Sequence, residues 1–383
     1  MDAVDRGAAG PSPVEPVAQL RRLIGALRAL LPRVRDGEAR ETTEAFDAHR
    51  FWDKLGQRAL AVSQEATKLS LAFARPPLPS SEDCRKLCES IQNAVLAEVS
   101  AYYWLPKDQG ITLRKMVRDT IVDVVEGMAQ LAEVIVRARP QCISHEYLIS
   151  TGSIWETCDQ VSHLPKDNKA AALLMLASYL RVVKDALEEM EQAQGDSGDP
   201  YSDILEDDEL GSRGNRDTYW SEEDQQLLAP CVGLMKASKA CLKKVRSSVE
   251  THGKTVVADQ IAQLDDIVDI SNEISPSCIL LETMSGFSCL EGIEAGDERK
   301  RPEYLSPICY LLVDELALSM YPPLNRMAVR LNAAKLASVL KKVLEITKAS
   351  HVCPHEEENW IQFLSSAIDH NMNKIKNLTQ GEL

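Results

Sequence analysis

The sequence is poor in aromatic residues, and it has fewer basic than acidic residues. Phe, Trp and Tyr make up 5% of the 383 residues, whereas hydrophobic residues as a whole make up 44%. Strands draw on aromatic and β-branched residues, so this balance favours helices. The formal net charge is −15 at pH 7. Such a surface is unsuited to nucleic acid and to an anionic membrane leaflet, because both bind through basic side chains.

Long apolar runs and catalytic motifs are missing as well. No stretch reaches the roughly 18 apolar residues of a transmembrane helix, and residues 1–6 lack the apolar core of a signal peptide. The ten cysteines form no CxxC pair, which favours the reduced thiols of an intracellular protein. There is no phosphate-binding loop, HExxH, GxSxG or calcium-binding loop. We expect a non-enzymatic protein without cofactor or metal that binds neither nucleic acid nor membrane.

Apolar residues recur at intervals of three and four along most of the chain, which predicts long amphipathic helices. The stripes cover residues 17–34, 46–69, 87–99, 113–135, 168–193, 228–249, 257–270, 329–346 and 360–375, and a shorter segment surrounds Ile154. Residues 80–83 indicate a helix start, Ser221 is a favourable N-cap, and Pro pairs mark breaks. No segment alternates as a strand does. The predicted class is all-α, with long amphipathic helices in two antiparallel helix bundles.

A change in composition near residue 195 divides the chain. Residues 196–224 hold eleven Asp or Glu against two Arg, with glycines between them. Such a segment repels itself and favours an extended linker. The expected organisation is a disordered tail over 1–15, an N-terminal bundle over 16–194, an acidic flexible linker over 195–218 and a C-terminal bundle over 219–383.

Two groups of potential metal ligands have simpler explanations. The first consists of His351, Cys353 and His355. It lacks an evident fourth ligand, and the proline among them indicates a loop at the end of a helix. The second consists of Asp265, Asp266, Asp269 and Glu273. Di-iron bundles also need Glu-x-x-His motifs, and no histidine is near, so we expect a solvated acidic helix face.

Two apolar patterns could bind a partner protein. Residues 21–24 and 28–31 follow the basic-x-Leu pattern of peptides that dock to cyclins, but their leucines belong to the buried stripe of a helix. A second pattern could form a seam against a partner helix: Leu336, Val339, Leu340, Val343 and Ile346. Fewer than three clean heptads are present, which favours an intramolecular core. For these five residues partner binding stays open as the alternative.

Three serines are candidates for phosphorylation: Ser202, Ser275 and Ser306. Ser275 and Ser306 precede proline, but both lack the basic residue that cyclin-dependent kinases prefer three positions later. Ser202 lies in an acidic run, which is typical of substrates of acidophilic kinases. Added negative charge there would extend an already acidic linker.

Several blocks resemble the cyclin-D-binding protein family known as GCIP or Maid. They are residues 103–115 (YWLPKDQGITLRK), 167–176 (DNKAAALLML), 219–222 (YWSE), 237–244 (ASKACLKK), 263–271 (QLDDIVDIS) and 339–350 (VLKKVLEITKAS). The resemblance implies an Id-like negative regulator of cell-cycle progression that binds a D-type cyclin and restrains phosphorylation of the retinoblastoma protein. It also implies sequestration of helix-loop-helix transcription factors, binding to a leukocyte SH2/SH3 adaptor, and a location in nucleus and cytoplasm.

One segment departs from the family pattern. In the family, the equivalent of residues 274–277 continues almost directly into that of residues 314–319. Here residues 278–313 intervene, with three cysteines, a basic cluster and no helical stripe. We expect an alternatively spliced or retained insertion that is disordered and interrupts the C-terminal bundle. The alternative function is a scaffold or adaptor of the cytoskeletal or adhesion type, because long helical bundles serve there too.

Overall fold

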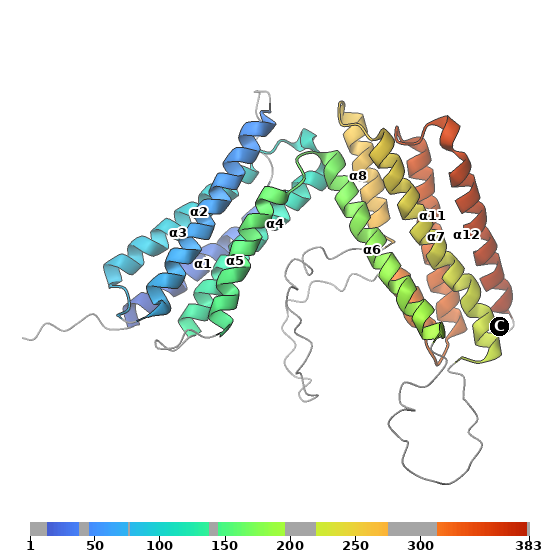
Figure 1. Ribbon diagram of the computed structural model, residues 1–383, viewed down its shortest axis with the longest axis horizontal. Coiled ribbons are helices and arrows are strands. Elements are labelled where there is room, and N and C mark those ends of the chain that lie inside the picture. The colour runs from blue at the N-terminus through green and yellow to red at the C-terminus, as the bar shows by residue number, and fades with distance from the viewer. Residues whose placement is uncertain are drawn as a thin grey trace, which may run out of the picture. The chain divides into compact units, whose positions relative to one another are not determined.

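The computed structural model describes residues 14–37, 46–75, 77–137, 145–195, 220–274 and 312–380 (Figure 1). Within these ranges the chain forms helices and no strand, so the predicted all-α class is confirmed. The helices group into two compact units, Met1–Asp167 (unit 1) and Asn168–Leu383 (unit 2). None of the described helices combines the length and apolar character needed to cross a bilayer.

Unit 1 is built from helices that close around one core. Its described elements are α1 (Val14–Asp36), α2 (Ala48–Ala74), α3 (Ser81–Tyr102), the 3-10 turn η1 (Lys107–Gln109), α4 (Ile111–Arg137) and α5 (His145–His163). Helix α1 packs against α3 and α4, α2 packs against α3 and α5, and α4 packs against α5. The apolar stripes point inward, and fully buried side chains include Leu27, Leu55, Leu69, Ile121 and Met128.

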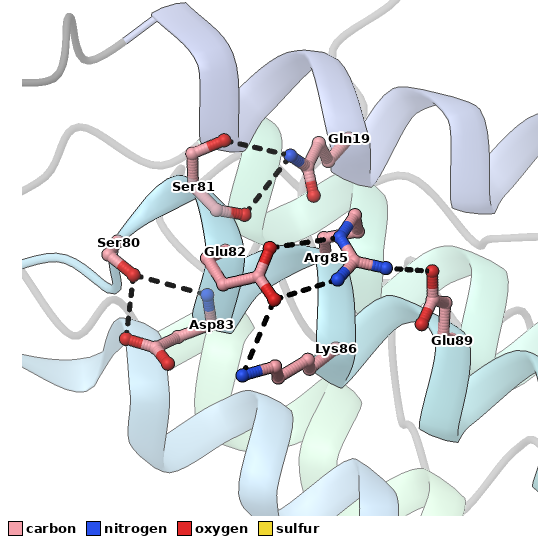
Figure 2. Close-up of polar contacts among 8 residues, drawn as sticks. All are labelled: Gln19, Ser80, Ser81, Glu82, Asp83, Arg85, Lys86 and Glu89. Carbon is pink, nitrogen blue, oxygen red and sulfur yellow. Dashed lines mark hydrogen bonds and ion pairs between the residues drawn. The ribbon is translucent and has the colours of Figure 1, made fainter.

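Helix α3 begins at the serine that the sequence indicates. Ser80 Oγ accepts a hydrogen bond from the Asp83 amide at 3.1 Å and donates to Asp83 Oδ2 at 2.7 Å (Figure 2). The carboxylates of Glu82 and Asp83 suit the positive end of the helix dipole. Gln19 Nε2 of α1 donates to the carbonyl and the hydroxyl of Ser81, both at 3.1 Å. The start of α3 is therefore both capped and tied to α1.

We expect Ser80→Ala to lower the free energy of unfolding of unit 1 by about 1 kcal/mol, because the Asp83 amide loses its acceptor. Urea denaturation followed by circular dichroism measures this change. Ser100→Ala is the matched control, since Ser100 is exposed on the same helix and its hydroxyl donates only to the Leu96 carbonyl. The control should change stability by less than about 0.5 kcal/mol. Equal losses in the two variants would contradict the capping role.

Unit 2 is a second assembly of packed helices. Its described elements are α6 (Asn168–Gly195), α7 (Glu222–His252), α8 (Ala258–Asn272), α10 (Leu312–Ser319), α11 (Arg326–Ala349), η3 (His355–Glu357) and α12 (Asn359–Leu378). Helix α11 packs against α7, α8, α10 and α12, and α7 also packs against α12. Ser221 caps α7 as expected: its hydroxyl accepts from the Asp224 amide, and Asp224 Oδ2 accepts from the Ser221 amide, at 3.1 and 3.2 Å.

Helix α6 differs from the expected domain organisation. Residues 168–194 should complete the N-terminal bundle if the change in composition marks the boundary. In the structure, α6 packs against α7, α8 and α10. At its start, Asn168 Nδ2 donates to Asp265 Oδ1 at 2.9 Å, and Lys169 Nζ donates to the Glu250 carbonyl at 2.9 Å. The units therefore divide between residues 167 and 168, because an amphipathic stripe does not specify which helices will cover it.

Three other expectations concern residues that are largely outside the described ranges: the tail over 1–15, the acidic linker and the insertion. The last two residues of the expected tail, Val14 and Glu15, belong to α1. Gly195 ends α6, and residues 196–218 are not described. Leu312 and Val313, the last residues of the expected insertion, begin α10, and Val313 is fully buried. The C-terminal helices thus resume two residues before position 314.

Candidate protein-interaction surface

The stripe on α11 that could have formed a partner seam lies mostly inside unit 2. Leu336, Leu340 and Val343 have no exposed surface, and Val339 is 6% exposed. Ile346 is partly exposed. Because α7, α8, α10 and α12 pack against α11, a partner could reach the four buried side chains only if the unit opened. Burial therefore assigns them to the core of unit 2, the interpretation that the short heptad run favours.

The histidines that follow α11 do not converge on a common point. His351 Nδ1 lies 2.7 Å from Gln263 Oε1, and its Nε2 accepts a hydrogen bond from the Lys254 amide at 3.0 Å. His355 Nδ1 lies 2.6 Å from Glu358 Oε1, and the cysteine between them is buried. Among the described residues, no three His, Cys, Asp or Glu side chains are placed to hold a metal ion. His351 instead ties the α11–α12 loop to α8 and to the α7–α8 loop.

The carboxylates of α8 divide between surface and interior. Asp266, Asp269 and Glu273 are exposed, as a solvated face requires. Asp265 differs from this expectation, since it is 8% exposed and accepts a hydrogen bond from Asn168 Nδ2 at 2.9 Å. The donor comes from the start of α6, far away in the sequence. A pattern confined to α8 could not reveal it.

The two basic-leucine motifs are helical in α1. Leu23 and Ile24 of the first motif are 3% and 8% exposed, and Leu30 and Leu31 of the second are partly exposed. A docking peptide must be extended and accessible along its length. The helical state of α1 does not present either motif in that form.

The three phosphorylation candidates lie outside the described ranges: Ser202, Ser275 and Ser306. The nearest described neighbour is Ile274, which precedes Ser275 and is fully buried just after α8. Modification of the three serines stays a prediction.

A connected group of ion pairs covers the start of α3 (Figure 2). Arg85 donates to Glu82 through Nε and Nη2 at 3.1 and 2.7 Å, and to Glu89 through Nη1 at 2.6 Å. Lys86 Nζ lies 3.3 Å from Glu82 Oε1. Hydrogen bonds from Arg85 and then from Lys86 lower the pKa of Glu82. These charges are exposed and satisfy one another along one helix, so they support α3 modestly and do not form a binding site.

Exposed apolar side chains gather on α2 and α5. Six large hydrophobic side chains in the described part of unit 1 are well exposed, and four of them belong to these two helices. Leu60 and Leu71 of α2 are 58% and 70% exposed, and Leu148 and Trp155 of α5 are 60% and 47% exposed. Single exposed hydrophobic residues are ordinary, whereas a cluster on adjacent helices is typical of an interaction site. We name these four residues the α2–α5 face.

Polar contacts fix the seam beneath the α2–α5 face. Trp155 Nε1 donates to Thr67 Oγ1 at 2.9 Å, and the hydroxyls of Ser70 and Thr151 are 2.8 Å apart. Rising numbers on α2 thus meet falling numbers on α5, so the two helices are antiparallel. The contact between Trp155 and Thr67 holds the indole across the seam.

The four residues of the α2–α5 face lie on one outward side of the helix pair. Leu60, Thr67 and Leu71 follow the spacing of seven and four that forms one stripe on a helix. On α5, Leu148 and Trp155 are seven apart, and Gly152 lies between them. A Cβ atom built on Gly152 would meet nothing within 4 Å, so the backbone there is open to an approaching group.

The two edges of the α2–α5 face carry opposite charge. Helix α5 contains no Lys or Arg, and its Glu156 and Asp159 are exposed. On α2, Lys68 is exposed and lies 2.7 Å from Glu65 Oε1, and Arg75 is exposed at the end of the helix. The edge along α5 is therefore acidic, and the edge along α2 carries the exposed Arg75 beside a Lys68–Glu65 ion pair.

Unit 1 also buries a carboxyl group behind this surface. Glu98 of α3 is 1% exposed, and neither of its carboxyl oxygens has a hydrogen-bond partner within the described residues. Burial raises the pKa of Glu98 to about 8, against the opposing influence of Arg58. Arg58 directs its Nη1 to the Ala97 carbonyl at 2.7 Å. Glu98 is therefore largely protonated at neutral pH.

Two family models match consecutive parts of the chain. Residues 54–196 match the N-terminal model of the Grap2 and cyclin-D-interacting proteins, and residues 205–278 match the C-terminal model. The chain belongs to the Grap2 and cyclin-D-interacting protein family. The first family model ends at residue 196 and the second begins at residue 205, so they meet at the acidic segment. The boundary between the packed units lies earlier, between residues 167 and 168. The C-terminal match ends at residue 278, where the sequence places the start of the insertion.

Relatives in this family cover nearly the whole chain. Cyclin-D1-binding protein 1 homolog of Xenopus laevis is 57% identical over 364 residues, which are 95% of this chain and 99% of the relative. Cyclin-D1-binding protein 1 of Homo sapiens is 50% identical over 389 residues, covering 98% and 97%. The homolog of Danio rerio is 43% identical over 370 residues, covering 96% and 97%. The resemblance seen in the sequence blocks is thus confirmed, and these family members are named as binding proteins.

Proposed function

We propose that this protein binds a D-type cyclin and regulates the cell cycle without catalysing a reaction. The proposal depends on one observation: a human relative named for binding cyclin D1 is 50% identical to this protein over 98% of the chain. The exposed apolar face on α2 and α5 supplies a surface of the kind that protein partners use. The physical mechanism is steric masking, in which the bound protein covers a surface that the cyclin needs for other contacts.

Finer roles extend the same proposal. Binding to the cyclin would restrain phosphorylation of the retinoblastoma protein, and a second set of contacts would sequester helix-loop-helix transcription factors. The family description joins Grap2 to cyclin D, which supports an SH2/SH3 adaptor as another partner. We propose the nucleus and the cytoplasm as its location, as the resemblance to the family implies. Their support is the resemblance to the family, together with the general ability of helical surfaces to accept a partner helix.

The test compares the full chain with a version that lacks residues 278–311 and so keeps all of α10, including the buried Val313. Each is immobilised and incubated with a purified D-type cyclin, and an unrelated helical protein of similar net charge is the control for non-specific retention. We expect both versions to retain the cyclin, because the shortened version keeps every described helix of unit 2, including α10 from Leu312. Retention by the shortened version alone would mean that the insertion disables the interface. Retention by neither would contradict the cyclin proposal and favour the scaffold alternative.

A further inference from the structure

We infer that the α2–α5 face receives one amphipathic helix of the partner, with Trp155 as its central anchor. The inference deepens the proposed function and rests on it, because the partner used to test it is a D-type cyclin. It assigns the interface to unit 1 and to four named side chains: Leu60, Leu71, Leu148 and Trp155.

The shape of the face favours a helix as its occupant. Two antiparallel stripes with residues at spacings of four and seven present ridges between which a third helix can pack. Gly152 leaves the middle of the α5 stripe open, so a ridge can approach the backbone there. The described residues include no strand whose edge a partner strand could extend. A proline-rich peptide would need several aromatic side chains side by side, whereas Trp155 is the one aromatic residue of the face.

Trp155 has the properties of a binding anchor. Its indole is 47% exposed, so it offers a large apolar surface to a partner. The hydrogen bond from Nε1 to Thr67 Oγ1 at 2.9 Å fixes the ring before any partner arrives. A side chain that is already ordered loses little conformational entropy on binding. Tryptophan is also enriched among the residues that dominate the free energy of binding at interfaces.

The charged edges define the chemistry of the partner helix. The acidic edge of Glu156 and Asp159 requires basic residues on one side of its apolar stripe. Arg75, exposed at the end of α2, favours an acidic residue on the other side. Because opposite charges lie on opposite edges, a helix with this pattern fits in one direction and is repelled in the reverse one.

Unit 2 offers a matched surface for comparison. Leu318 of α10 and Met327 and Leu331 of α11 are 72%, 51% and 58% exposed. This group contains no aromatic anchor. Leu331 has nearly the same exposure as Leu148, and it lies on a helix of similar length, so Leu331→Glu is a suitable control for Leu148→Glu.

The first experiment measures the affinity of the full chain for a purified D-type cyclin by titration calorimetry. We expect Leu148→Glu and Trp155→Ala to weaken binding at least about tenfold, and Leu331→Glu to change it less than about twofold. Thermal unfolding of each variant checks that unit 1 stays folded, which the exposure of Leu148 and Trp155 favours.

A second experiment tests the charged edges. Glu156→Lys should weaken binding about three- to tenfold at low salt, and the difference should shrink as salt screens the charges. Glu345→Lys is its control, because Glu345 is an exposed residue of α11. A zero-length carbodiimide reagent should join Glu156 or Asp159 to a lysine in a helical segment of the cyclin.

The outcomes separate the inference from the function on which it rests. Tight binding by wild type and equally tight binding by Leu148→Glu and Trp155→Ala would overturn the inference and leave the proposed function intact. Absence of binding by wild type would overturn both. A wild-type dimer that Leu148→Glu dissociates, with unchanged cyclin affinity, would show that a second copy of this chain occupies the face, which also overturns the inference.

Discussion

Glu98→Gln should stabilise unit 1 at neutral and alkaline pH by an amount that grows as the pH rises. The pKa of Glu98 is raised by burial from 4.5 to about 8 in the folded protein. Between these values the folded state keeps a proton that the unfolded state releases, so the free energy of unfolding falls with rising pH. One such proton contributes a slope of up to about 1.4 kcal/mol per pH unit. Glutamine removes this contribution because it does not ionise.

Urea denaturation of unit 1 at several values between pH 5 and pH 8.5 measures the effect. At pH 5 the variant and wild type should differ little, and at pH 8 the variant should be more stable by about 2 to 4 kcal/mol. Glu89→Gln is the matched control, because Glu89 is exposed on the same helix. Parallel profiles for wild type and Glu98→Gln would show that the carboxyl is not buried as described.

Asp123 of α4 contributes to the same profile. Burial, followed by the charges of Glu126 and Asp119, raises its pKa to about 7, and Arg35 opposes the rise. Its contribution to stability therefore also falls as the pH increases from the ordinary value of 3.8 towards 7. Glu98→Gln alone should reduce the slope of the wild-type profile, and Glu98→Gln combined with Asp123→Asn should flatten it further.

Leu340→Ala should destabilise unit 2 by roughly 2 to 5 kcal/mol, because a fully buried side chain is replaced by a cavity. Leu340 has no exposed surface on α11, whereas Leu331 of the same helix is 58% exposed. Leu331→Ala is therefore the control and should cost less than about 0.5 kcal/mol. Hydrogen exchange of α11 and α12 during urea titration reports on unit 2 specifically.

The same pair of variants distinguishes a core residue from a partner seam. If Leu340 belongs to the core, Leu340→Ala keeps its affinity for a D-type cyclin under conditions in which unit 2 remains folded. A loss of affinity without loss of stability would contradict the core assignment. It would favour the alternative in which the apolar stripe on α11 binds a partner helix.

Local features of the fold were predictable because short-range chemistry determines them. The spacing of apolar residues indicates the helices, and Ser80 and Ser221 indicate two of their starts, since a cap depends on residues three positions away. The neighbours of a helix depend on the whole chain. For that reason the sequence did not reveal that α6 packs against the helices of unit 2, or that Asn168 is the partner of Asp265.

The residues of the α2–α5 face could not be predicted from the sequence for the same reason, because exposure also depends on neighbouring helices. Ile154 is buried and Trp155 is exposed, and the positions of α2 and α4, which both pack against α5, decide which of these adjacent side chains faces outward. The burial of Glu98, in contrast, had a signal in the sequence. Glu98 follows Ile91 by seven residues and Val95 by three, so it continues their buried stripe. A charged residue on such a stripe is easily mistaken for an exposed one.

Titration of a purified D-type cyclin into the purified full-length chain tests the central claim most directly. An unrelated helical protein of similar net charge is titrated in parallel, so that attraction by charge alone is measured separately. The account predicts saturable binding with a stoichiometry of one cyclin per chain, and no saturable binding by the control protein. A flat titration with correctly folded components, or equal binding by the control, would contradict the claim that this helical protein is a specific partner of D-type cyclins.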